Sequence, residues 1–199
     1  MKNFIKTAMA ILLLSNSLYA ISATINFNPS TTTIFLGNTF NVDVVISDLG
    51  NGSAPSLGAF DFDVNYDPTV LSFSGGIFGT GLDLFGLGSI SGVTPGATSV
   101  NFFEISLDSE IDLNALQPDS FVLVSLAFNA IAVGNSQLSF GINDFADGAG
   151  DRLLINGIPG NALVSSASSV PEPAGVWLMG LGSVFFYIVK LRKITNENT

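Results

Sequence analysis

Carboxylates are the only side chains in the middle of this chain that remain for acid–base chemistry. The sequence contains no histidine and no cysteine, which excludes serine–histidine–aspartate triads, thiol nucleophiles, disulfides and zinc held by imidazole or thiolate. Of the 16 acidic residues, all but Glu172 and Glu197 lie between Thr24 and Ser169, where the single basic residue is Arg152. This balance repels nucleic acid, whose binding depends on lysine and arginine at phosphates.

An acidic, glycine-rich stretch, NDFADGAGD, follows the last clear strand pattern and is predicted to be a loop. Asn143, Asp144, Asp147 and Asp151 are its candidate calcium ligands, because hard oxygen donors on a flexible loop suit that ion. The spacing differs from that of an EF-hand, and an ion pair between Asp151 and Arg152 is the alternative. The sequence requires no cofactor, and calcium is the one that it suggests.

A pair of carboxylates for glycoside hydrolysis is the other chemistry to consider. Asp61 and Asp63 lie on one face of a predicted strand, about 7 Å apart by the strand repeat. Alternating acids on the water-facing side of a half-buried strand more often serve solubility. We therefore expect a non-catalytic protein, with a polysaccharide hydrolase as the less favoured alternative.

A two-residue hydrophobic period positions these acids. It is clearest where Phe60, Phe62, Val64 and Tyr66 alternate with polar residues, which is typical of a strand with one buried face. Glycine, proline, asparagine and aspartate separate such segments, and no long amphipathic helix is evident. The pattern predicts an all-β fold, an antiparallel β-sandwich of about eight to nine strands. The predicted strands cover residues 24–27, 31–36, 40–47, 60–66, 70–73, 89–93, 98–105, 121–130 and 137–142, with one helical turn at 113–116.

The segment FDFDVNYDPTVLSFSG resembles the cohesin-like domains, which are related to carbohydrate-binding modules. Tyr66, Asp67, Pro68 and Leu71 match the family's tyrosine–aspartate–proline turn and the leucine strand after it. The resemblance implies a jelly-roll sandwich of eight to nine strands over residues 24–164, with a structural role for the turn. It also implies carbohydrate binding or, as the alternative, docking of a protein on the cell surface. Because this chain lacks the calcium-loop repeats of a dockerin, a docked partner has to be another chain.

The first 23 residues have the order of a secretory signal peptide. Two lysines precede an apolar run at 8–14, and small residues follow. That run is too short for a stable span, and signal peptidase cleavage could follow Ala20, Ser22 or Ala23. A signal anchor that is not cleaved is the alternative.

The C-terminal part begins with a serine-rich linker, 165–169, and continues as VPEPAGVWLMGLGSVFFYIVKLRK over 170–193. The two prolines prevent a helix from propagating backwards. The uncharged segment 174–189 is predicted to be one transmembrane helix, although its length of about 24 Å is short of a hydrocarbon layer of about 30 Å. Basic side chains after it can reach the membrane interface. A polar tail, 194–199, ends the chain.

This order of parts resembles the PEP-CTERM sorting signal of Gram-negative bacteria that make extracellular polysaccharide. The matching residues are Val170, Pro171, Glu172, Pro173, Lys190, Arg192 and Lys193. The resemblance implies recognition by an exosortase-type membrane protease, and the polar tail is longer than the family leads us to expect. An ordinary C-terminal membrane anchor is the alternative.

Together these patterns predict an exported protein of the cell surface or extracellular matrix that is associated with exopolysaccharide and biofilm. It would cross the inner membrane, be anchored transiently by its C-terminal helix, and then reside in the cell envelope or matrix. Its expected partners are signal peptidase, the exosortase-type protease and either an extracellular polysaccharide or a surface protein.

Processing of the tail can be tested directly. If the sorting signal is cut, the intact mass of the surface form will lack the residues that follow Pro173. A surface form whose mass retains residues 174–199 would contradict processing and favour the plain anchor.

Overall fold

Two β-sheets packed face to face make up the part of the chain that the computed structural model describes, residues 22–29 and 33–166. The first sheet has five strands in the order β10-β1-β3-β8-β5. Along the chain these are β1 (Ser22–Pro29), β3 (Thr39–Ser47), β5 (Leu71–Phe78), β8 (Phe121–Ala130) and β10 (Leu154–Ile158).

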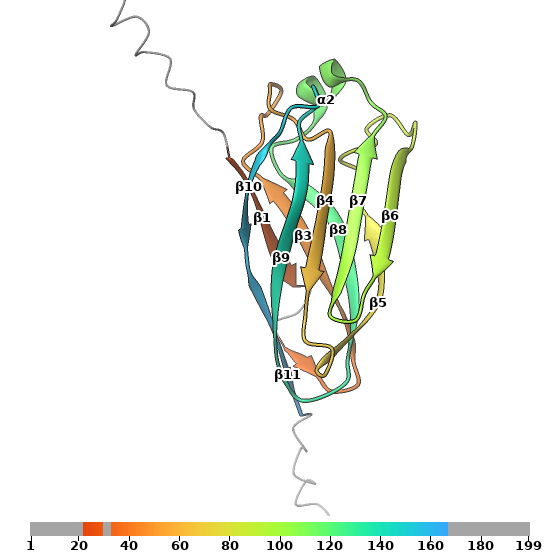
Figure 1. Cartoon of the computed structure of the whole chain (residues 1–199), viewed down its shortest axis with the longest axis vertical. Helices are drawn as coiled ribbons and strands as arrows, with labels where there is room; N and C mark the ends of the chain where they lie inside the picture. Colours follow the sequence, from red (N-terminus) through yellow and green to blue (C-terminus); the bar gives the residue numbers. More distant parts are fainter. Residues whose placement is uncertain (1–21, 30–32, 167–199) are drawn as a thin grey trace, which may run out of the picture. The chain divides into compact units, whose positions relative to one another are not determined.

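The second sheet has six strands in the order β2-β11-β9-β4-β7-β6. Figure 1 shows β9, β4, β7 and β6 side by side, with the short helix α2 at one end of the sandwich. The elements are β2 (Ile34–Phe35), β4 (Ala59–Asn65), β6 (Ser89–Pro95), β7 (Ser99–Ser106), α2 (Glu110–Leu116), β9 (Gly134–Ala146) and β11 (Gly160–Ser165). The predicted all-β sandwich is confirmed.

A phenylalanine-rich core fills the space between the sheets. The inward side chains of β4 are Phe60, Phe62 and Val64, which are at most 2% exposed. The ring of Phe62 lies 5.9 Å from that of Phe102 and 6.2 Å from that of Phe145, centroid to centroid. Because these rings come from three neighbouring strands of the second sheet, they bind β4, β7 and β9 into one apolar layer.

Three strand pairings contain a register shift, and two of these shifts change which residues face inward in the core and beside Asp61. The pairing of β3 with β8 shifts between Val44 and Val45, so that both Leu123 and Val124 are buried although they are neighbours in the sequence. The pairing of β4 with β9 shifts between Asp61 and Phe62, opposite Asn143. Each shift inserts one residue in one strand, as a β-bulge does, and re-aims the side chains that follow.

The structure corrects the strand predictions at the end of the domain. β9 continues to Ala146, so Asn143 and Asp144 lie in a strand and not in a loop. Two further strands, β10 and β11, follow the stretch that was expected to come after the last strand. Both are short and contain glycine and asparagine, which conceals their period.

The expectation of a fully antiparallel sandwich is wrong at two edges. β1 pairs in parallel with β10, and β2 pairs in parallel with β11. These pairs join the first strands of the domain to its last ones. Strand residues therefore reach from Ser22 to Ser165, slightly beyond the predicted limits of 24–164 on both sides.

The sorting motif, the predicted membrane segment and nearly all of the signal peptide lie outside the described residues. Within residues 22–29 and 33–166, no helix has the length and apolar character needed to cross a bilayer.

Phe62 offers a test of the core. Replacing it with alanine removes a ring that is 0% exposed, and we expect a loss of about 3–5 kcal/mol in the free energy of unfolding. Urea denaturation of the purified domain measures this loss. Phe85→Ala, at a site that is 53% exposed, is the matched control and is expected to change stability by no more than about 0.5 kcal/mol. Equal effects of the two substitutions would contradict the assigned core.

Candidate functional site

The outer surface of β9, β4, β7 and β6 carries three rows of side chains that run across the strands. Register places directly paired residues next to one another on the same face of a sheet. The first row is Ile90, Ile105, Ala59 and Ala146. The second is Gly92, Phe103, Asp61 and Asp144. The third is Thr94, Asn101, Asp63 and Gly141. We call this surface the outer face.

The first row is an exposed apolar strip. Ile90 is 55% exposed and Ile105 is 45% exposed, and the two residues are directly paired. Single exposed aliphatic side chains are common on proteins, but paired isoleucines on a regular sheet form a continuous apolar surface.

The strand β7 has an inverted pattern at this strip. Its inward residues are Val100 and Phe102, followed by Glu104, which is 2% exposed, whereas Ile105 points outward. An acid inside and an isoleucine outside break the alternation that sheet stability favours. Such local exceptions concentrate at functional sites, which makes this end of β7 the most informative part of the face.

In the second row, an aromatic ring lies over a glycine. A Cβ atom on Gly92 would come within 2.5 Å of a Phe103 ring atom, so the ring occupies the space that a side chain at position 92 would need. Glycine at this place is therefore required for Phe103 to lie across β6. The result is a flat aromatic surface over β6, on the side of β7 that faces away from the acids of β4 and β9.

Amide donors hold two of the acids of the face. Asp61 Oδ1 accepts hydrogen bonds from Asn101 Nδ2 at 2.7 Å and from Asn143 Nδ2 at 3.0 Å. Asn143 Nδ2 also donates to Asp63 Oδ2 at 3.3 Å. Asp61 and Asp63 thus share one amide on an open sheet surface. A glycosidase pair flanks the scissile bond of its sugar, and this arrangement does not favour such a role.

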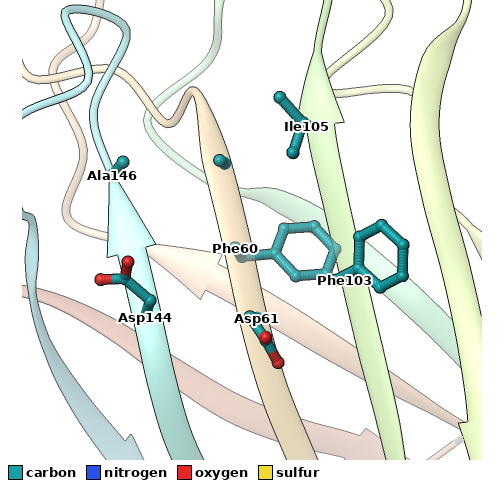
Figure 2. Close-up of a pocket in the computed structure, with 7 residues that line it drawn as sticks. Phe60, Asp61, Phe103, Ile105, Asp144 and Ala146 are labelled. Atoms are coloured by element: carbon teal, nitrogen blue, oxygen red, sulfur yellow. The ribbon is translucent and has the colours of Figure 1, made fainter.

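A hollow of about 210 Å³ opens between β9, β4 and β7. Figure 2 shows Asp61 and Asp144 on neighbouring strands, with Phe103 and Ile105 on β7, the strand next to β4. The lining residues are Ala59, Phe60, Asp61, Phe103, Ile105, Asp144 and Ala146. The hollow is therefore acidic on one side and apolar on the other.

The predicted calcium ligands are divided between two elements: Asn143 and Asp144 lie in β9, and Asp147 and Asp151 lie in the turn after it. The carboxylate of Asp147 accepts hydrogen bonds from the backbone N–H groups of Ala149 and Asp151, at 3.0 and 2.9 Å. In the part of the chain that the structure describes, no three acidic residues are grouped closely enough to hold a metal ion. The structure does not support calcium binding by this set, because β9 extends through half of the stretch and Asp147 closes a turn with its own carboxylate.

The motif at Tyr66 forms a turn between β4 and β5. Asp67 Oδ1 accepts hydrogen bonds from the N–H of Thr69 at 2.9 Å and from its hydroxyl at 2.6 Å, and both bonds lower the pKa of Asp67. The carbonyl of Asp67 accepts from the N–H of Leu71 at 2.9 Å. The ring of Tyr66 lies 5.2 Å from that of Phe128, so it is directed into the core. These residues shape the connection and do not contribute to the outer face.

Behind the outer face, Glu104 is a buried acid. Ser89 Oγ donates a hydrogen bond of 2.6 Å to its Oε1 and links β6 to β7. Burial raises the pKa of Glu104 above its ordinary value of 4.5; the hydroxyl of Ser89 opposes this shift, and the negative charge of Asp83 adds to it. Burial therefore disfavours the ionised form of the acid that lies under the apolar strip.

Comparison with known proteins identifies the fold. No family model and no curated protein matches the sequence. A solved structure of the seventh ScaB type I cohesin from Pseudobacteroides cellulosolvens is similar, with a TM-score of 0.61 and 12% identity over 76% of this chain and 97% of that chain. The sandwich has the cohesin fold.

Two further cohesins have the same architecture. A non-cellulosomal cohesin from the hyperthermophilic archaeon Archaeoglobus fulgidus has a TM-score of 0.56 and 17% identity, covering 73% of this chain and 92% of that one. A type I cohesin–dockerin complex from Clostridium thermocellum has a TM-score of 0.60 and 12% identity, covering 73% and 95%. At such identities the similarity establishes the fold and does not assign a function.

Sequence reasoning locates β7 but does not identify Ile90, Phe103 and Ile105 as site residues. A strand pattern assigns apolar residues to the core, and only structure shows which of them face outward. The one signal in the sequence is the order of Phe102, Phe103, Glu104 and Ile105, in which no strict alternation can bury every apolar residue.

Glu104 generates a prediction about pH. Because the pKa of this acid is raised in the folded state, the folded protein holds a proton that the unfolded chain releases, and stability falls as the pH rises from about 4.5 through the raised value. We expect Glu104→Gln to stabilise the domain, by an amount that increases between acidic and neutral pH. Urea unfolding at several pH values measures the difference from wild type.

Asp119→Asn, at an exposed position, is the control. Its difference from wild type in the free energy of unfolding should not change over the same pH values. If the difference in unfolding free energy between Glu104→Gln and wild type does not grow with pH, the pKa of Glu104 is not raised in the folded protein.

Proposed function

We propose that the sandwich is a non-catalytic docking module that binds another protein through its outer face. The observation that carries the proposal is the apolar strip of paired isoleucines beside ordered acids on a regular sheet. The solved cohesin–dockerin complex from Clostridium thermocellum supports it, since a domain of this fold serves there as one half of a protein complex.

The strip is suited to protein contact in energetic terms. Fully burying an isoleucine stabilises a complex by about 1.5–3 kcal/mol, and Ile90 and Ile105 are each about half exposed in the free domain. The face belongs to a sheet backed by the phenylalanine core, so little conformational entropy has to be lost on binding. The partner is another chain, because no dockerin-type repeat is present in this one.

Carbohydrate binding, the function first expected from the sequence, has less support on this face. Stacking of sugars uses exposed aromatic rings, and in the three rows the only aromatic side chain is Phe103. The domain's tyrosine is directed into the core. A polysaccharide-rich location remains part of the proposal through the sorting signal and does not depend on sugar contacts of the sandwich.

The proposed location is the cell surface or extracellular matrix. This part rests on the signal peptide, 1–23, and the sorting motif, 170–193, as sequence patterns. The structure bears on the cleavage site of the signal peptide, because Ala23 in β1 is 0% exposed and pairs with Ile155 in β10. Cleavage after Ala20 would keep β1 whole, whereas cleavage after Ala23 would remove a core residue. We therefore propose Ile21 as the first residue of the mature protein.

Ile105→Glu tests docking. The domain is used to capture partners from the extracellular fraction of the organism that encodes it, and the captured protein is then purified and titrated calorimetrically. We expect Ile105→Glu to weaken binding at least about tenfold, which corresponds to about 1.4 kcal/mol, because it places a charge in the apolar strip.

Ile77→Glu is the matched control, since Ile77 is 76% exposed on β5 in the other sheet, and its affinity should remain within about twofold of wild type. Binding that survives Ile105→Glu, or that is lost equally in both variants, would contradict docking through this face. A parallel glycan array that gives saturable binding dependent on Ile105 would favour carbohydrate instead.

A further inference from the structure

The hollow between β9, β4 and β7 has walls of two kinds. Asp61 and Asp144 are directly paired across β4 and β9, which places their Cα atoms roughly 4.5–5.5 Å apart. Phe103, Ile105 and the two alanines of the first row form the remaining wall. A ligand that fills this space has to satisfy carboxylates on one side and pack against carbon on the other (Figure 2).

The domain does not neutralise these carboxylates itself. Arg152 is the single basic residue among residues 22–29 and 33–166. Asp61 is bonded to amides, which carry no net charge, and the carboxylate of Asp144 has no hydrogen-bond donor within the described part of the chain. The negative charge of the hollow therefore calls for a cation on the partner.

We infer that the partner inserts an arginine side chain into this hollow, an inference that rests on the proposed docking function. A guanidinium is planar and carries five N–H donors, so it can bond to Asp61 and Asp144 together. Its flat face can pack on the apolar wall of the hollow, to which Phe103 and Ile105 belong. The aliphatic stem packs against Ile105 and Ala146, in the way that long basic side chains cover apolar surface.

Lysine satisfies only part of this site. Its ammonium is a compact, strongly hydrated charge and lacks the planar fork of donors that can bond to two carboxylates at once. The geometry thus selects arginine over lysine by shape, and both over neutral side chains by charge. Because the hollow is open to water, added salt weakens the contact.

A small-molecule probe tests the hollow directly, in the absence of the partner. N-acetyl-arginine amide is titrated into the ¹⁵N-labelled domain, and amide shifts are followed by NMR. We expect saturable shifts centred on positions 61, 103 and 144, and a several-fold weaker effect in Asp144→Asn. N-acetyl-citrulline amide, a neutral molecule of the same shape, should give none, and Asp119→Asn should behave as wild type.

Three results would overturn the inference: no saturable shift with the arginine probe, equal shifts with the citrulline probe, or undiminished shifts in Asp144→Asn. Asp144 is exposed, so the ¹H–¹⁵N spectrum of this variant should show an unchanged fold. Asp61→Asn removes the other carboxylate of the hollow, and it provides a second variant that should weaken binding of the probe.

The partner captured from the extracellular fraction separates the two proposals. If Ile105→Glu abolishes the complex while Asp61→Asn and Asp144→Asn leave its affinity and salt dependence unchanged, docking stands and the arginine inference fails. If the complex survives Ile105→Glu, the docking function itself fails. If Asp144→Asn weakens the complex and reduces its salt dependence, both stand.

Discussion

The layer of phenylalanine rings between the two sheets is the interaction on which the rest of this structure depends. The chain has no cysteine, so no disulfide supports the sandwich, and hydrophobic burial has to hold it together. Phe62 contacts rings from both neighbouring strands of its sheet. Because successive residues of a strand point to opposite sides, filling the inner side in this way also determines which residues stand on the outer face.

Packing of the core thus determines the positions of the side chains on the outer face. Asp61 lies between Phe60 and Phe62, and Phe103 follows Phe102. Each outward residue is fixed in position because its neighbour in the strand is buried in the core. Asp61 and the ring of Phe103 are therefore held on a rigid sheet and not on a loop. Such support favours recognition, since ordering costs have been met by folding. The buried Glu104 under the strip is an acid at an inward position of this layer, and its burial raises its pKa.

Sequence patterns are sufficient for the fold where the alternation is regular. Phe60, Phe62 and Val64 are expected inside and are buried, and the sandwich follows from such strands. The patterns miss the parallel edge pairs and β10 and β11, because glycine and asparagine interrupt their apolar residues. The calcium hypothesis loses its support for a related reason: acidic and glycine residues indicate a loop, while hydrogen bonding across the sheet continues β9 through Asn143 and Asp144. The hollow depends on register between three strands, which no single stretch of sequence contains.

Photo-crosslinking on the surface of the producing cells tests the central claim of docking through the outer face most directly. The photoreactive amino acid p-benzoylphenylalanine replaces Phe103 in one variant and Ile77, on the other sheet, in a second. Docking through the outer face predicts a crosslink to one distinct protein from position 103 and none to that protein from position 77. A crosslink from position 77 alone, or no crosslinked protein from position 103, would contradict it.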